Sequence, residues 1–131
     1  MPEWMRAVKL QQRAARSGFD WPGPAPVIEK LHEEIGEVQA ELEAVADDPG
    51  DAAARVRLEE EIGDLLFVAA NLARHAQVDV GSALRRANLK FERRFRAMEA
   101  LAAAEGTALP ELPLDALEAY WRRVKEQEGG G

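Results

Sequence analysis

A chain of 131 residues is one ordinary domain, so any chemistry must come from a single core or from a second copy of the chain. Alanine, leucine, glutamate and arginine dominate and favour helices over a disordered segment, while a net charge of −7 disfavours binding to a nucleic-acid polymer. Without cysteine, an apolar signal core or a run of about 18 apolar residues, we expect a cytoplasmic protein that has no membrane partner.

The first predicted helix covers residues 3–16 and is weakly amphipathic. Residues 17–18, Ser-Gly, are expected to end it. Residues 19–24 are rich in turn formers and predict a rigid connector, in which Phe19 and Trp21 are available to anchor the loop.

The clearest helical pattern in the chain lies between Ile28 and Val45, where apolar residues alternate three and four apart. It predicts a helix to about residue 46, followed by a break at residues 47–51 and a third helix at about 52–76. These two helices should form an antiparallel hairpin. Their apolar faces are broader than the rest of this small chain covers, which favours a homodimer or higher homo-oligomer.

A fourth helix is predicted from the pattern of Leu84–Leu101, with Asp79 as its N-cap and its end at Gly106. The chain shows no β-alternation and no glycine-rich phosphate loop. The predicted fold class is therefore all-α.

The last predicted helix is short and begins near Asp115, because Asp115 and Glu118 resemble a capping box. Residues 129–131 are all glycine and are expected to be a disordered tail. We therefore expect residues 1–128 to form a single domain.

Two acidic pairs carry the main chemical signal. Glu34 and Glu37 on the second helix, and Glu61 and Asp64 on the third, are each three residues apart, so each pair projects from one side of its helix. Each pair lies roughly 90° from the centre of its apolar stripe, so the acids should flank the core face and can converge at the edge of the seam. Divalent cations would relieve their repulsion, and oxygen donors without cysteine or paired histidines favour magnesium or manganese.

Two observations bear on this interpretation of the acidic pairs. Gly36 and Gly63 lie inside the predicted helices, where close approach of a helix or ligand would explain them. Against it, acidic stripes are usually solvated faces with local lysine or arginine partners. Because two such pairs lie beside strong apolar stripes, we favour a metal site over a solvated acidic face.

Basic and aromatic side chains supply further candidates. Lys90 and Arg94 share one helix face and can clamp a triphosphate, although salt bridges to the acidic helices explain them equally well. Trp121 can stack on a nucleobase, but an aromatic residue in a small domain is more often core or interface. His32 and His75 form no metal-spaced pair and are expected to be peripheral.

Five segments, in order along nearly the whole chain, resemble the MazG nucleotide pyrophosphohydrolases. They are GFDWP at 18–22, KLHEEIGE at 30–37, EEIGDLLF at 60–67, RRANLKFERRF at 85–95 and YWRRVK at 120–125. The resemblance implies a four-helix-bundle-like protomer, completed by dimerisation, that hydrolyses nucleoside triphosphates to the monophosphate and pyrophosphate.

The resemblance also assigns residues. It implies that the catalytic acids and magnesium ligands, with manganese as a possible substitute, are Glu34, Glu37, Glu61 and Asp64. It implies nucleotide contacts at Lys30, Glu33, Arg57, Glu60, Lys90, Arg94 and Trp121. Among these, Lys90 and Arg94 would hold phosphate and Trp121 would lie near the base. The expected nucleophile is metal-activated water, which Glu33 or Glu60 could orient.

Two alternatives remain open from the sequence. The first is a related pyrophosphohydrolase acting on dUTP, a phosphoribosyl nucleotide or a damaged nucleotide. The second is a noncatalytic helical dimer whose acidic seam binds a cation or a protein partner. The second alternative predicts no pyrophosphate release, and melting that is insensitive to nucleotide and magnesium.

Overall fold

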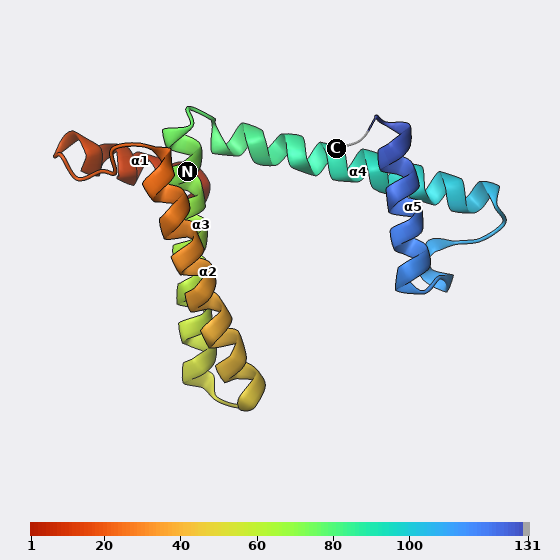
Figure 1. The fold of residues 1–131 in the computed structure, drawn as a ribbon, viewed down its shortest axis with the longest axis horizontal. Coiled ribbons are helices and arrows are strands. Elements are labelled where there is room, and N and C mark those ends of the chain that lie inside the picture. The colour runs from red at the N-terminus through yellow and green to blue at the C-terminus, as the bar shows by residue number, and fades with distance from the viewer. Residues whose placement is uncertain (130–131) are drawn as a thin grey trace. The chain divides into compact units, whose positions relative to one another are not determined.

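The computed structural model describes residues 1–129, and within them the chain is all-helical, with no strand, which confirms the predicted fold class (Figure 1). The α-helices are α1 (Glu3–Arg16), α2 (Pro24–Asp47), α3 (Ala52–His75), α4 (Val80–Ala104) and α5 (Leu114–Gln127), with a short 3-10 helix, η1 (Leu109–Glu111), before α5. The chain divides into two compact units, Met1–Ala83 and the part from Leu84 onward.

Most helix boundaries follow from local chemistry. The Asp51 carboxylate accepts hydrogen bonds from the Ala53 and Ala54 N–H groups at 3.0 and 3.2 Å and so caps α3. Asp79 accepts from the Ser82 N–H at 2.8 Å, which confirms its predicted place before α4. Gly106, at φ +81°, adopts the left-handed conformation expected just after a helix.

The predicted capping box of the last helix is wrong. Helix α5 begins at Leu114, with Pro113 in the capping position and no side-chain cap hydrogen bond. Asp115 therefore lies inside the first turn, where its carboxylate accepts from the Ala116 N–H at 2.8 Å. The physical reason is that Pro113, whose ring fixes φ, takes the capping position. The helix therefore begins at Leu114, one residue before Asp115.

Helices α2 and α3 run side by side as the predicted hairpin (Figure 1). Along both helices, buried or half-buried residues recur at alternating spacings of four and three, which is the pattern of a two-helix seam. The seam positions are Val27, Leu31, Glu34, Val38, Glu41 and Val45 on α2, and Ala54, Leu58, Glu61, Leu65, Val68 and Leu72 on α3.

Only part of the expected apolar stripe packs in this seam, and the rest is exposed. Ile28, Ile35 and Leu42 are 44%, 47% and 50% exposed, and Ile62 and Leu66 on α3 are exposed as well, although all five were expected to face inward. Each follows a seam position by one residue, which turns it about 100° away from the partner helix. In an antiparallel pair this rotation carries both sets to the same side of the hairpin, so the first unit has one exposed apolar face.

The loop between α1 and α2 is held by charge rather than by its aromatic residues. Phe19 is 81% exposed and Trp21 38% exposed, so the predicted aromatic anchors are not buried. Instead, Asp20 accepts a hydrogen bond from Arg74 at 2.6 Å and lies 2.9 Å from His75 Nε2. His75, expected to be peripheral, thus helps to fix the loop on the end of α3.

The second unit has its own small core. Met98 and Ala102 of α4, Leu109 of η1, and Tyr120 and Val124 of α5 are buried together. Farther back along α4 the predicted apolar side is open to solvent, with Leu84, Phe91 and Phe95 all exposed.

Two predictions concern the end of the chain and the membrane. Gly129, in the predicted glycine tail, lies in a turn. Its backbone N–H donates a hydrogen bond to the Glu126 carbonyl oxygen at 3.1 Å. Residues 130–131 of that tail lie outside the described residues. Within residues 1–129, no helix is both long and apolar enough to cross a membrane.

Candidate functional site

The acidic site lies inside the seam of the α2–α3 hairpin. One carboxylate oxygen from each of Glu34, Glu61 and Asp64 can be chosen so that all three lie within 4.8 Å of one another. Glu37 is outside this group, but its carboxyl group hydrogen-bonds Glu61. The structure therefore gathers all four predicted acids around one point between the two helices.

Two of the four acids, Glu34 and Glu61, are more deeply placed than predicted, whereas Glu37 and Asp64 are exposed. Glu34 is only 4% exposed and occupies a seam position, whereas the acids were expected at the edge of the seam. The reason is that the seam follows residues 27, 34 and 41 instead of 28, 35 and 42. Glu34 and Glu61 consequently replace apolar residues in the middle of the interface between the helices.

The electrostatic consequence is visible at Glu61. Its hydrogen bond with Glu37, its burial, and the negative charges of Glu37, Asp64 and Glu34 together raise the pKa of Glu61 to about 7. Among the described residues, neither Glu34 Oε2 nor Glu61 Oε2 has a hydrogen-bond partner, although both atoms are buried. Buried, unpaired carboxylate oxygens are unfavourable unless a cation or donor reaches them.

These residues fit a hard divalent cation. The donors are all carboxylate oxygens, they converge at a spacing that one ion can bridge, and two of the oxygens lack a partner within the described chain. A cation at this point would also remove the repulsion that raises the pKa of Glu61. The cluster can therefore hold a metal ion.

Two of the predicted nucleotide contacts lie beside the acids on α2. Lys30 Nζ lies 3.2 Å from Glu34 and 3.8 Å from Glu33, and the hydrogen bond with Glu34 raises the pKa of Lys30. The expectation that acidic stripes have local basic partners thus holds for Glu34. It does not extend to Glu61, whose surroundings are acidic.

On α3, Arg57 and Glu60 lie one turn or less before Glu61. Arg57 Nε bonds Glu41 of α2 at 3.1 Å, which links the two helices beside the acidic cluster. The Glu60 side chain is exposed. At about 100° per residue, Lys30, Glu37, Arg57 and Asp64 all project roughly 55–75° from the seam toward one side of the hairpin, opposite the exposed apolar face.

The remaining predicted contacts belong to the second unit. Arg94 is 6% exposed, bonds Glu128 through Nε at 3.0 Å, and lies over the Trp121 ring at 5.6 Å. Trp121 also packs against Phe91, with ring centroids 5.6 Å apart. Lys90 is exposed. Arg94 and Trp121 therefore form one cluster on α4 and α5, and the Glu128 carboxylate pairs with Arg94 in it.

Glu128 was not singled out from the sequence. It accepts hydrogen bonds from both Arg93 and Arg94, which lower its pKa to about 2. No local signal identifies it, because it lies at the end of the last helix and its partners are more than 30 residues earlier.

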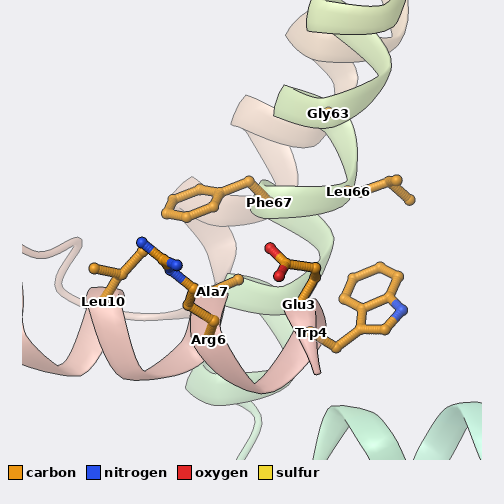
Figure 2. A pocket seen from close by; sticks show the side chains of 8 residues that line it. All are labelled: Glu3, Trp4, Arg6, Ala7, Leu10, Gly63, Leu66 and Phe67. Atoms are coloured by element: carbon orange, nitrogen blue, oxygen red, sulfur yellow. The ribbon is translucent and has the colours of Figure 1, made fainter. Parts of the chain in front are cut away.

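Pockets in the first unit open where α1 meets α3. Figure 2 shows the pocket of about 370 Å³ that is lined by Leu10 and Ala7 of α1 and by Gly63, Leu66 and Phe67 of α3. The close approach expected at the two helix glycines does not occur within the described chain, because a Cβ at Gly36 or Gly63 would meet no atom within 4 Å. Gly63 instead forms part of the wall of this open pocket.

Fold and site together define a helical protein with an acidic cluster, able to hold a metal ion, in the seam between two antiparallel helices. The profile of the MazG nucleotide pyrophosphohydrolase domain matches residues 23–98, which include α2, α3 and most of α4. This chain belongs to the MazG family.

Relatives from Escherichia coli and Thermotoga maritima match nearly the whole chain. A nucleoside triphosphate pyrophosphohydrolase of Escherichia coli strain K12 is 46% identical over 129 residues, which are 98% of this chain and 46% of that protein. A nucleoside triphosphate pyrophosphohydrolase/pyrophosphatase MazG of Thermotoga maritima is 42% identical over 125 residues, 95% of this chain and 45% of that protein. The chain thus spans about half the length of these relatives.

Proposed function

We propose that this chain hydrolyses nucleoside triphosphates, of the ribose or deoxyribose series, to a nucleoside monophosphate and pyrophosphate. In this reaction a water oxygen bonds to the α-phosphorus, and the bond from that phosphorus to the oxygen bridging the α- and β-phosphates breaks. The observation that carries the proposal is the convergence of Glu34, Glu61 and Asp64 inside the seam, with two buried oxygens unpaired among the described residues. Membership of the MazG family supports it.

The acids are proposed to hold magnesium, with manganese as a substitute. Glu34, Glu37, Glu61 and Asp64 would supply the protein ligands, because hard cations favour carboxylate oxygens. Magnesium in such a site supplies a bound water of lowered pKa and offsets negative charge on phosphate oxygens. This accounts for acids whose mutual repulsion would otherwise destabilise the hairpin.

The chain's own residues would position the triphosphate. Lys30, whose Nζ lies 3.2 Å from Glu34, would donate to a phosphate oxygen. Lys90 and Arg94 are proposed to bind phosphate as well, and Trp121 to contact the nucleoside. Glu33 and Glu60, both with exposed side chains next to a proposed ligand, are candidates to orient the attacking water.

We also propose that the protein acts as a homodimer or higher homo-oligomer. The exposed apolar face of the first unit includes Ile28, Ile35 and Leu42, seven residues apart on α2, with Ile62 and Leu66 on α3. A contiguous apolar face of this kind favours burial against a second copy. It lies on the opposite side of the hairpin from Asp64 and Glu37, so assembly through it would leave the acidic side open.

The reaction is tested by measuring monophosphate and pyrophosphate release from a panel of nucleotides, with magnesium and with EDTA. The panel includes canonical NTPs and dNTPs, dUTP, a phosphoribosyl nucleotide and oxidised nucleotides. We expect both products in equal amounts with magnesium, none with EDTA, and none from Asp64→Asn, whose folding is checked by circular dichroism.

The other outcomes of this experiment are also informative. If a modified nucleotide or dUTP is the best substrate, the chain is a specialised member of the same class. If no nucleotide releases pyrophosphate and nucleotide with magnesium leaves the melting temperature unchanged, the noncatalytic helical dimer is the correct alternative.

A further inference from the structure

The Arg94 side chain in the second unit is held on two sides. Its Nε donates to Glu128 Oε1 at 3.0 Å, and its guanidinium carbon lies 5.6 Å from the centre of the Trp121 ring. The side chain is only 7% exposed. The ring contact limits the tilt of the planar guanidinium, and the bond at Nε limits its rotation within the plane. Arg94 is therefore held in one orientation.

The opposite edge of the Arg94 guanidinium has no partner in the part of the chain that the structure describes. Neither Nη atom makes a hydrogen bond there, and neither is fully buried. A guanidinium can present two parallel N–H groups to one phosphate, a geometry that a lysine cannot reproduce. Lys90, one turn earlier on the same side of α4, is exposed. The Nη edge and Lys90 together offer donors to an anion.

Glu128 is not where its own helix favours an acid. It occupies the C-cap position of α5, and the partial negative charge at the end of a helix disfavours a carboxylate there. The stabilising partners are on α4, where Arg93 donates through Nε and Nη2, both at 3.1 Å, and Arg94 donates through Nε. These bonds lower the pKa of Glu128 to about 2, so its carboxylate is charged at neutral pH.

A carboxylate beside a phosphate contact repels the phosphate unless another group offsets its charge. Arg93 does so, because it bonds both carboxylate oxygens of Glu128. Two guanidinium groups and one carboxylate leave the cluster with a net positive charge, and Lys90 adds to it. Glu128 can thus orient Arg94 without cancelling its attraction for an anion.

We propose that Glu128 is a positioning residue for Arg94, which it holds by Nε so that the free Nη edge meets a phosphate of the nucleotide. The inference rests on the proposed function, in which Arg94 binds phosphate. The opposite role is that Glu128 occupies Arg94 in place of a phosphate and must leave before the substrate binds. The two roles predict effects of opposite sign when Glu128 is removed.

The first test is the kinetics of Glu128→Ala with the best nucleoside triphosphate and magnesium. Freeing Arg94 should raise KM roughly tenfold, about the strength of one hydrogen bond to a charged group. The kcat should change little, because Arg94 would contact the phosphate both in the bound substrate and in the transition state. Glu128→Gln keeps an acceptor for Nε and should recover most of the loss.

Glu105→Ala is the matched control for a purely structural role. Glu105 also joins the end of α4 to α5, accepting from Tyr120 at 2.7 Å and from Arg123 at 2.6 Å, but it makes no hydrogen bond to Arg94. We expect this variant to lower the melting temperature and leave KM unchanged. In an Arg94→Lys background, which lacks the guanidinium to be oriented, Glu128→Ala should have no further effect on KM.

The second test needs no turnover. The arginine side-chain N–H signals of the intact protein are followed by ¹H–¹⁵N NMR, and the Arg94 signals are identified by their loss in Arg94→Lys. The Nε–H signal should move in Glu128→Ala and stay in place in Glu105→Ala. Inorganic pyrophosphate, added with magnesium, should shift the Arg94 Nη signals while the Nε–H bond to Glu128 persists.

The two proposals fail in different ways. A lower or unchanged KM in Glu128→Ala, in a protein that hydrolyses nucleotides, would overturn the positioning role and leave the proposed function intact. Loss of the Nε–H bond when pyrophosphate is added, or no change in any Arg94 signal, would overturn it as well. If no nucleotide is hydrolysed, the proposed function fails; Nη shifts with pyrophosphate that Glu128→Ala abolishes would still support the positioning of Arg94 toward phosphate.

Discussion

Replacing Glu34 by leucine should make the metal-free protein more stable while removing its activity. Glu34 occupies a seam position, is 4% exposed, and has one buried oxygen without a partner among the described residues. Leucine of similar length would bury apolar surface there, which contributes about 1.5–3 kcal/mol for a full side chain. The lost contact with Lys30, at 3.2 Å and with Lys30 partly exposed, offsets only a small part of this.

The net expectation for Glu34→Leu is a gain of about 1–3 kcal/mol in the free energy of unfolding. Gains of this size are found when buried charged groups in other proteins are replaced by well-packed apolar residues. Urea denaturation in EDTA, followed by circular dichroism, measures this gain as a higher midpoint concentration of urea, with the slope of unfolding free energy against urea unchanged. Glu43→Leu, the same change at an exposed position of α2, is the matched control and should stay within about 0.5 kcal/mol of the wild type. A loss of stability in Glu34→Leu would refute the reasoning, because it would show that the carboxylate supports the metal-free fold.

Three further predictions concern other parts of the chain. Asp51→Ala removes the cap of α3 and should cost about 1 kcal/mol in urea denaturation. Val124→Ala, at a fully buried position, should cost about 2 kcal/mol by the same measurement, from lost burial and a small cavity. Because Arg93 and Arg94 hold the pKa of Glu128 near 2, below its ordinary 4.5, the stability it contributes is complete above about pH 4.5 and declines toward pH 2. The gap in urea midpoint between wild type and Glu128→Gln should therefore be largest at neutral pH and shrink in acid; a gap that is the same at pH 3 and pH 7 would contradict this.

The helices could be predicted from the sequence because their signals are local. Asp51 and Asp79 cap the helices that follow them, and the spacing of apolar residues defines α2 and α3. The capping box failed because Pro113 and Asp115 both suit a helix start, and only the structure shows which one begins the turn.

The acidic cluster was predictable as a set but not in its depth. Residues 27, 34 and 41 and residues 28, 35 and 42 are both seven apart, so the sequence offers two candidate seams on α2. The more apolar of them, with Ile35 and Leu42, is the natural choice from hydrophobicity alone. The structure packs the other one against α3 and leaves Ile35 and Leu42 exposed, which a second copy would explain.

Other site features depend on contacts distant in sequence. Gln11 reaches Phe67 across 56 residues, and Asp20 reaches Arg74 across 54. No periodicity or motif links these residues, so neither the contact between Gln11 and Phe67 nor the anchoring of the loop could be derived from the chain alone. The signal available was Gln11 itself, a polar residue on an otherwise apolar side of α1.

The most direct test of the central claim is phosphorus-31 NMR of the products that the wild type forms from its best nucleoside triphosphate with magnesium. The account predicts equal amounts of nucleoside monophosphate and pyrophosphate, with neither product formed by Glu61→Gln. Formation of nucleoside diphosphate and orthophosphate, or unchanged turnover in Glu61→Gln, would contradict it.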